Sequence, residues 1–382
     1  MTADDQRRSP TQLTDDQRLD WLRLIRSDRI GPATFRALLD HFGSVAAAIE
    51  AAPELAKRGG QAIRICPVDA AEREMDELDR LGARLIAISE NDYPPLLAHI
   101  DGPPPLIAVR GNAAIFSRPT IAIVGSRNAS ITGVKIAKSI ARDLGGHGYA
   151  IASGLARGID AAAHEASLED GTIAVLAGSL NRIYPPGNVR LAQAIVDNGG
   201  AHLSEMPIGW EPRARDFPRR NRLVSGLSLA AVIVEAAARS GSLITARLAG
   251  EQGRLVFAVP GSPLDPRSVG ANRLIRDGAH IATDVNDIIT EIAPMLGQPA
   301  VQISPIEEIP PAKVPSAPEP GDSDRERVVA ALGPTPVDLD DIVRFTELPP
   351  ATIHYLLLEL DLAGRIARHA AGRVSLVMHQ SR

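Results

Sequence analysis

Two glycine-containing segments, each following a short apolar run, carry residue types suited to binding phosphate groups. Gly125-Ser126-Arg127 follows Thr120-Ile-Ala-Ile-Val124, and Ser153-Gly154 follows Ala150-Ile-Ala152. Glycine allows close approach of backbone to a ligand, and amides at the start of a helix favour an anion. The guanidinium of Arg127 adds a permanently charged fork for phosphate oxygens. Both segments therefore predict an anion site.

A third segment of small residues follows another apolar run. Ala230-Ala-Val-Ile-Val234 is followed by Glu235 and then by Ser240-Gly-Ser-Leu-Ile-Thr245. Small residues at a helix start make an amide-lined anion cradle, so Ser240, Gly241 and Thr245 are candidate binding residues. Glu235 could act as a general base or accept hydrogen bonds from loop amides, and we favour the second role.

An arginine-rich strip precedes that run. Residues 213–222 contain five arginines and one aspartate, which could be no more than a solvated charge run. We expect a rigid loop that presents Arg219, Arg220, Asn221 and Arg222 beside the same site, because arginine neutralises phosphates and asparagine can bond phosphate, ribose or base. Phe217, within the strip, is expected in the core.

The sequence contains no recognisable catalytic set. It has neither a G-x-G-x-x-G segment after the first strand nor a G-x-x-x-x-G-K-[ST] segment. Asp160 is expected to cap the helix that carries His164, and His164 to be a structural hydrogen-bonding residue. We predict no catalytic residue, no metal site and no cofactor. The pattern favours binding a phosphate chain over transforming it.

Composition limits the classes of protein that are possible. The 382 residues carry a net charge of −5, which excludes a protein that coats polyanions over its whole surface. Residues 119–297 hold 18 Lys/Arg against 16 Asp/Glu, so a local basic site is expected there. The single cysteine, Cys66, fits a reducing cytoplasm. The lack of a long apolar run predicts no membrane span, and 3% aromatic residues argue against an aromatic stacking platform.

Strand and helix patterns alternate through residues 119–297. The three runs above, with Thr172-Ile-Ala-Val-Leu176 and Leu255-Val-Phe-Ala-Val259, predict buried strands, while Gly133–Leu144 and Ser242–Gln252 predict helices. This pattern predicts an α/β fold, an extended Rossmann-like, doubly wound, mostly parallel sheet. The glycine segments would then share the crevice at the carboxyl edge of the sheet.

Two smaller modules are expected to flank this sheet. Residues 14–85 show a helix–glycine turn–helix pattern, similar to a SAM-like or helix-hairpin-helix module, and we favour a packing role for it over contact with DNA backbone. The predicted domains are 1–85 (helical), 86–297 (Rossmann-like, core 119–297), 298–322 (a linker with seven prolines) and 323–382 (winged helix).

The C-terminal module shows three helices and a hairpin. Residues 325–332, 339–345 and 351–363 predict the helices, and 365–368 with 373–377 predict the hairpin, which together form a winged-helix pattern. The recognition helix contains no Lys or Arg and carries Glu359 and Asp361. A helix in a major groove needs basic or amide side chains, so protein contact is favoured over DNA reading.

Taken together, these segments resemble the DNA-processing protein A family, also called DprA or Smf. The matching segments cover roughly residues 90–285: Ile123-Val-Gly-Ser-Arg127, Ser153-Gly-Leu-Ala-Arg-Gly-Ile-Asp160, Phe217-Pro-Arg-Arg-Asn-Arg222, Ser240-Gly-Ser-Leu-Ile-Thr-Ala246 and Val259-Pro-Gly261, with Tyr93-Pro94 and Tyr184-Pro185.

The resemblance implies a non-enzymatic protein of natural transformation. Such proteins bind and protect incoming single-stranded DNA, help to load the RecA recombinase in the cytoplasm, and dimerise through the Rossmann-like domain. One alternative is a nucleotide-binding enzyme of the phosphoribohydrolase type, acting on nucleoside monophosphates. Its expected glutamate after Thr245 is absent, since Ala246-Arg247-Leu248 follows. Another alternative is a transcription regulator, which the acidic recognition helix disfavours.

Overall fold

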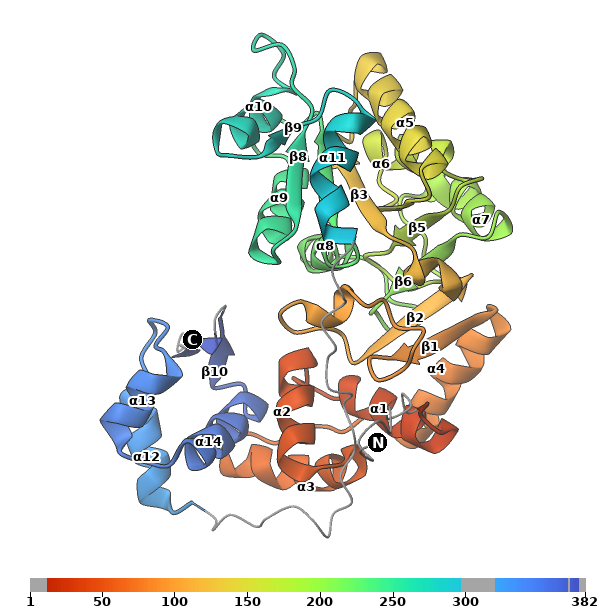
Figure 1. The fold of residues 1–382 in the computed structure, drawn as a ribbon. Coiled ribbons are helices and arrows are strands. Elements are labelled where there is room, and N and C mark those ends of the chain that lie inside the picture. Colours follow the sequence, from red (N-terminus) through yellow and green to blue (C-terminus); the bar gives the residue numbers. More distant parts are fainter. Residues whose placement is uncertain (1–11, 297–319, 370–371, 378–382) are drawn as a thin grey trace, which may run out of the picture. The chain divides into compact units, whose positions relative to one another are not determined.

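The computed structural model describes residues 12–296, 320–369 and 372–377 (Figure 1). The chain forms two compact units. Of the described residues, the sheet unit contains 74–296, and the helical unit combines 12–73 with 320–369 and 372–377. Most of the predicted proline-rich linker, 298–322, lies outside the described residues.

A sheet of nine strands forms the centre of the sheet unit, in the order β1-β2-β6-β5-β4-β3-β7-β8-β9. The strands from β3 to β9 pair in parallel, whereas β2 pairs antiparallel with both β1 and β6. This confirms the predicted mostly parallel, doubly wound sheet. The strands are β1 (Ala83–Ala87), β2 (Leu106–Gly111), β3 (Thr120–Gly125), β4 (Ala150–Ser153), β5 (Thr172–Val175), β6 (Ala201–Ser204), β7 (Ala230–Val234), β8 (Leu255–Ala258) and β9 (His280–Ile281).

Four strands escaped the sequence analysis. β1 begins at Ala83, so the expectation of helices alone over 14–85 is wrong. β2 lies outside the region where strands were sought, β6 has only four residues and includes His202, and β9 has two residues. Such short or polar strands depend on pairing with neighbours rather than on an apolar run of their own.

Helices cover both faces of the sheet (Figure 1). Alternate residues of β3 point to opposite faces, as the period of a strand requires. Ala122 and Val124 pack with residues of α8 and α9, whereas Ile121 and Ile123 pack with residues of α5, α6 and α11. The helices are α4 (Val68–Arg80), α5 (Ile131–Gly146), α6 (Ile159–Ala166), α7 (Val189–Asp197), α8 (Asp216–Gly226), α9 (Ser242–Glu251), α10 (Val269–Arg276) and α11 (Val285–Leu296), with short 3₁₀ turns η1 (Leu97–His99), η2 (Ala113–Ser117) and η3 (Pro186–Asn188).

The helical unit begins with three short helices, α1 (Asp15–Ile25), α2 (Pro32–Phe42) and α3 (Val45–Arg58). Pro32 occupies the first turn of α2, where its missing N–H costs nothing. Gly43 ends α2 in the left-handed conformation, and the Ser44 hydroxyl accepts a hydrogen bond from the Ala47 amide to begin α3. The turn at Gly43 is the helix–glycine turn–helix pattern expected from the sequence.

The C-terminal part of the helical unit is the predicted winged helix. It consists of α12 (Asp322–Ala331), α13 (Leu339–Thr346), α14 (Pro350–Leu362) and the antiparallel pair β10 (Ile366–Arg368) and β11 (Val374–Leu376). Its own core includes Val328, Ile342, Ile353 and Leu357. The module therefore has the apolar interior of a small domain.

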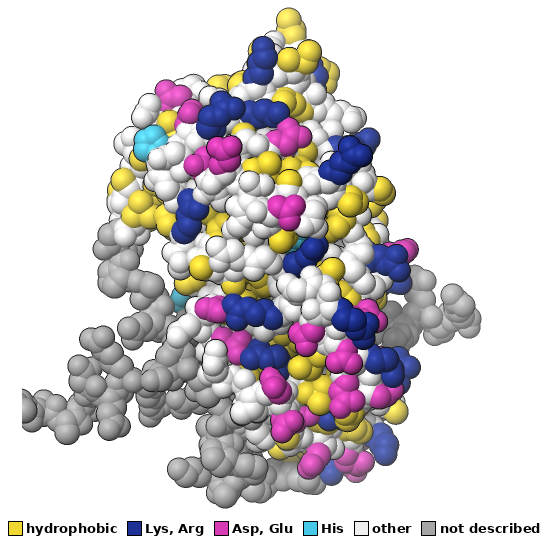
Figure 2. All heavy atoms as spheres, turned by 90° about the vertical axis from the view of Figure 1, so that its right-hand side faces the viewer, with side chains coloured by type: hydrophobic (Ala, Val, Ile, Leu, Met, Phe, Trp, Pro, Cys, Tyr) yellow, Lys and Arg dark blue, Asp and Glu magenta, His cyan; other side chains and the backbone are white. Residues whose placement is uncertain are grey.

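The face in Figure 2 interleaves basic and acidic side chains instead of gathering one sign of charge. This agrees with the small net charge and with the expectation that any basic site is local. None of the helices within the described residues has the length and apolar character that crossing a membrane requires.

Candidate functional site

A cavity of about 590 Å³ opens in the sheet unit where β3, β4 and β7 end. It brings together nine of the twelve predicted binding residues: Gly125, Ser126, Arg127, Gly154, Arg220, Asn221, Ser240, Gly241 and Thr245. The predicted gathering of these segments at one edge of the sheet is therefore observed. The other three, Ser153, Arg219 and Arg222, do not line the cavity.

Close backbone packing shapes the first wall of the cavity. A Cβ atom on Gly125 would lie 1.8 Å from the carbonyl oxygen of Val234, so only glycine fits where β3 ends against β7. Gly158, with φ of 78°, packs against the carbonyl of Ser126 in the same way. The loop carrying Ser126 and Arg127 is thus held in one conformation.

Glu235 fixes the segment that follows this loop. Its carboxylate accepts hydrogen bonds from the Ser130 amide, at 2.9 Å, and from the Ser130 hydroxyl. The same hydroxyl accepts from the Gly133 amide and so caps α5. The geometry assigns Glu235 the hydrogen-bond acceptor role favoured from the sequence.

Most of the arginine strip is helical, so the predicted rigid loop is wrong for Arg219, Arg220, Asn221 and Arg222. Residues 216–226 form α8, and the arginines on its two sides have different surroundings. Arg220 points to the cavity, whereas Arg219 and Arg222 both bind the carboxylate of buried Glu205, Arg219 at 2.8 Å. Arg222 also donates to the carbonyl of Gly102 at 2.9 Å. The sequence could not separate these arginines, because it does not show where Glu205 lies.

Arg220 is a buried cation at the base of the cavity, 5% exposed. Its Nη1 donates to the carbonyl of Val175 at 2.9 Å, but its Nε has no hydrogen-bond partner among the described residues. Burial lowers the pKa of Arg220 to about 10, with nearby Asp160 opposing that shift. A Cβ on Gly154 would meet the guanidinium at 1.7 Å, so this glycine makes room for Arg220.

Asp160 supports the same region without capping its helix. Gly158 is the N-cap of α6, so the capping role predicted for Asp160 is wrong. Its carboxylate instead accepts hydrogen bonds from the amides of Gly154 and Ala156, at 3.1 and 3.3 Å. Burial raises the pKa of Asp160, while Arg220 lowers it. The carboxylate is therefore an internal partner of loop amides.

Phe217 forms part of the cavity wall, which corrects its expected place in the core. Its ring is only partly buried and lines the cavity. The guanidinium carbon of Arg127 lies 5.1 Å from the ring centre, within cation–π range. The Tyr184 ring meets Phe217 edge-on at 5.6 Å. This local aromatic surface was missed because overall aromatic content says nothing about position.

The opposite wall is the start of α9. Gly241 is the N-cap, and the Ser240 and Ser242 hydroxyls bond each other at 2.7 Å. Asn221 donates to the Gly241 carbonyl at 3.4 Å and so joins α8 to this turn. The first amides of a helix lack internal partners and carry partial positive charge. Arg239, which lines the same wall, was missed by sequence analysis, although it directly precedes Ser240.

Two predicted residues from the second strand and its helix are structural. Ser153 is fully buried, and its hydroxyl donates to the carbonyl of Ile123 at 2.6 Å. His164 is also fully buried and bonds the Thr172 hydroxyl at 2.7 Å. Burial, with His202 and Arg220 nearby, lowers the pKa of His164 to about 3. His164 is thus the structural residue expected.

The chemistry of the cavity is that of an anion site. It combines Arg127, the buried Arg220 and the amides that begin α9. The one carboxylate that lines it, Asp160, already accepts from loop amides. Among the described residues, no group of three or more His, Cys, Asp or Glu could hold a metal ion. The arrangement suits binding of phosphate groups.

Comparisons with known proteins agree with this architecture. The model of the family described as "DNA recombination-mediator protein A" matches residues 84–293, more than half of the chain. Protein Smf of Escherichia coli K12 is 35% identical, over 93% of this chain and 95% of that protein. This chain belongs to the DNA-processing protein A family. Further family models match the flanks, a DprA-like N-terminal HHH domain at 15–76 and a DprA winged helix domain at 310–372.

Other members of the DNA-processing protein A family extend the comparison. DprA of Streptococcus pneumoniae is 42% identical, over 54% of this chain and 73% of that protein. A crystal structure of that protein superposes with a TM-score of 0.61 at 33% identity, covering 74% of this chain and 99% of the other. A Helicobacter pylori DprA structure, described by its single-stranded DNA binding mode, gives 0.51 at 31% identity, covering 56% and 96%.

Proposed function

We propose that the cavity of the sheet unit binds the sugar-phosphate backbone of single-stranded DNA. The observation that carries the proposal is the convergence of Arg127, the buried Arg220 and the start of α9 on one cavity. Arg220 supplies positive charge from below, where burial limits screening by salt. Proposed contacts are Gly125, Ser126, Arg127, Gly154, Arg220, Asn221, Ser240, Gly241 and Thr245, with Ser153, Arg219 and Arg222 in supporting positions.

The preference for a single strand rests on Phe217. An aromatic face beside a phosphate site can stack an unpaired base, and such stacking tolerates any base. In a duplex the bases are already stacked inside the helix and cannot reach a side chain at the wall of a cavity. The contact between Arg127 and Phe217 joins the charged and the aromatic parts of the site.

The proposed biological role follows from family membership. We propose that the protein takes part in natural transformation, protects incoming strands, helps to load the RecA recombinase in the cytoplasm, and dimerises through the Rossmann-like domain. The single-stranded DNA binding described for the Helicobacter pylori relative supports the handling of incoming strands. The family description as a recombination mediator supports the role with the recombinase. We propose that these roles are non-enzymatic, since Glu235 and Asp160 are committed to loop amides.

A competition titration tests the proposed ligand. The purified chain is titrated against a fluorescent single-stranded oligonucleotide at several salt concentrations, with unlabelled duplex as competitor. We expect binding that weakens with salt, that varies little with base sequence and that duplex does not displace. An absence of binding at low salt would contradict the proposal. Release of free base from nucleoside monophosphates would then favour the phosphoribohydrolase alternative.

A further inference from the structure

The recognition helix of the winged helix has two apolar faces. Ile353, Leu356, Leu357 and Leu360 belong to the core of the winged-helix module. Leu358 and Leu362, four residues apart on the other side of α14, are also buried but are not part of that core. An isolated winged helix would leave this second face open for its partner.

The N-terminal helices cover the second face. A Cβ atom on Gly59, the C-cap of α3, would lie 2.1 Å from the backbone oxygen of Glu359 and 2.8 Å from the Cβ of Ala363. The backbone of α3 therefore ends directly against the backbone of α14. The rings of His41 and Tyr355 also meet, with centres 4.9 Å apart. Direct backbone contact of this kind fits only a partner of matching shape.

The two parts also satisfy each other's helix ends. Arg29 donates from Nε to the carbonyl of Leu362, at the end of α14, at 2.7 Å. In return, Arg365 donates to the carbonyl of Gly59, at the end of α3, at 3.3 Å. The last carbonyls of a helix have no internal partner, and a cation there also complements the helix dipole. Each part therefore donates a hydrogen bond to a carbonyl at a helix end of the other part.

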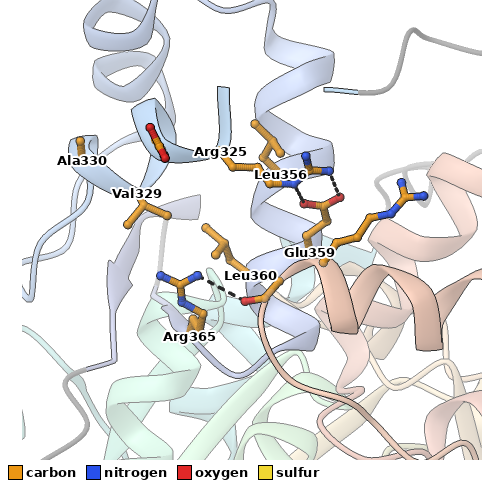
Figure 3. Close-up of a pocket in the computed structure, with 10 residues that line it drawn as sticks. Arg325, Val329, Ala330, Leu356, Glu359, Leu360 and Arg365 are labelled. Atoms are coloured by element: carbon orange, nitrogen blue, oxygen red, sulfur yellow. Dashed lines mark hydrogen bonds and ion pairs between the residues drawn. The ribbon is translucent and has the colours of Figure 1, made fainter. Parts of the chain in front are cut away.

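The acidic residues of α14 have partners inside the helical unit. Asp361 accepts from the hydroxyl of Thr34 at 2.9 Å and from Arg368 at 2.8 Å. Glu359 is buried and receives both Arg325 bonds, at 2.8 and 2.9 Å, as Figure 3 shows. Beside this pair lies a cavity of about 350 Å³, lined by Leu356, Leu360 and residues of α12. The carboxylates that disfavour DNA thus have a structural use.

We propose that the face of α14 that a winged helix would turn toward duplex DNA is here an interdomain docking surface, with the N-terminal helices of the same chain as its partner. The docked face carries carboxylates and no Lys or Arg, so a phosphate backbone would repel it. The complementary caps and the backbone contact at Gly59 select the N-terminal helices instead.

The test uses the full chain with a protease site inserted within residues 298–319. After cleavage, we expect the C-terminal fragment to remain with the rest of the chain in size-exclusion chromatography at micromolar concentration. Gly59→Ala should weaken this association at least tenfold, because Gly59 has helical φ of −68° and the three atoms nearest to the added methyl all belong to the docked partner. Gly31→Ala is the matched control, since open space surrounds Gly31.

A second variant keeps the test decisive if Gly59→Ala disturbs folding. Thr34→Val preserves shape and removes the donor to Asp361, so we expect about fivefold weaker association. Separation of the fragments in the parent chain, or equal association in parent and both variants, would overturn the proposal. A tenfold gain in duplex affinity on Gly59→Ala would support the docking, but it would contradict the statement that a phosphate backbone is repelled by the docked face of α14.

Discussion

Arginine side chains meet different surroundings in the two compact units. In the helical unit, Arg29, Arg325 and Arg365 each donate to carbonyl or carboxylate groups of the protein. In the cavity of the sheet unit, Arg220 keeps a buried Nε without a partner among the described residues, and Arg127 lies over an aromatic ring. Arginine thus joins parts of the helical unit, whereas at the cavity of the sheet unit it leaves positive charge available, and the position of the acceptors decides between the two.

Acidification should produce the largest difference in stability between the two units. Burial lowers the pKa of His164 to about 3 and that of His202 to about 4, so both rings stay neutral in the folded sheet unit. Below their ordinary pKa of 6.5 the unfolded chain takes up two protons that the folded chain does not. These two histidines therefore cost no stability above pH 6.5. As the pH drops toward 4, each lowers the free energy of unfolding by about 1.4 kcal/mol per pH unit.

The two tryptophans allow this to be measured unit by unit. Trp21 lies in the helical unit and Trp210 in the sheet unit, so variants keeping one of them report on one unit each. Urea unfolding at pH 7.5 and pH 5 should show, for the Trp210 reporter, a large loss of stability at the lower pH. The loss for the Trp21 reporter should be smaller, because His41, whose pKa burial also lowers, is only half-buried. Equal midpoints for Trp210 at both pH values would contradict this account.

The second largest expected effect is a loss of stability of the sheet unit on Arg222→Ala. It removes one of two cations bound to buried Glu205 and a donor to the Gly102 carbonyl, and we expect a loss of about 2–4 kcal/mol. Single-strand affinity at fixed folded fraction should change little. Chemical denaturation and anisotropy titration of the same variant separate the effects. A reduced salt slope with unchanged stability would instead place Arg222 at the DNA, as the sequence pattern suggested.

Arg127→Ala should show the opposite pattern. This side chain lines the cavity and its main contact is the Phe217 ring, so stability should fall by less than about 1 kcal/mol. Single-strand affinity should weaken, and the slope of log affinity against log salt should fall by about 0.7, the value for one phosphate contact. Arg247→Ala, which removes an exposed pair with Glu251, is the matched control. An unchanged slope would remove Arg127 from the site.

Deleting residues 323–382 should have the smallest effect on DNA. The docked face of α14 has no basic residue, so single-strand affinity should stay within a few-fold of the parent value. The Trp21 reporter should nevertheless unfold at lower urea, because the deletion exposes the surface around Gly59 and removes the acceptor of Thr34. A tenfold loss of affinity would show that the winged helix contributes to DNA binding.

The sequence by itself determined the three modules, five strands of the sheet and most of the cavity. It could do so because buried parallel strands form continuous apolar runs, because Gly125 marks where two backbones approach closely, and because Gly154 leaves room for the Arg220 side chain. Parallel pairing then brings the carboxyl ends of the strands to one edge without further information.

Only the tertiary structure decided what each charged side chain does. Three arginines within four residues of α8 diverge because a helix turns neighbours to different sides, and only the fold shows that Glu205 lies on one side and the cavity on the other. The same holds for α14, whose partner lies about 300 residues earlier in the chain. Local pattern sets the elements, but the partner of a buried charge is a long-range property of the packed chain.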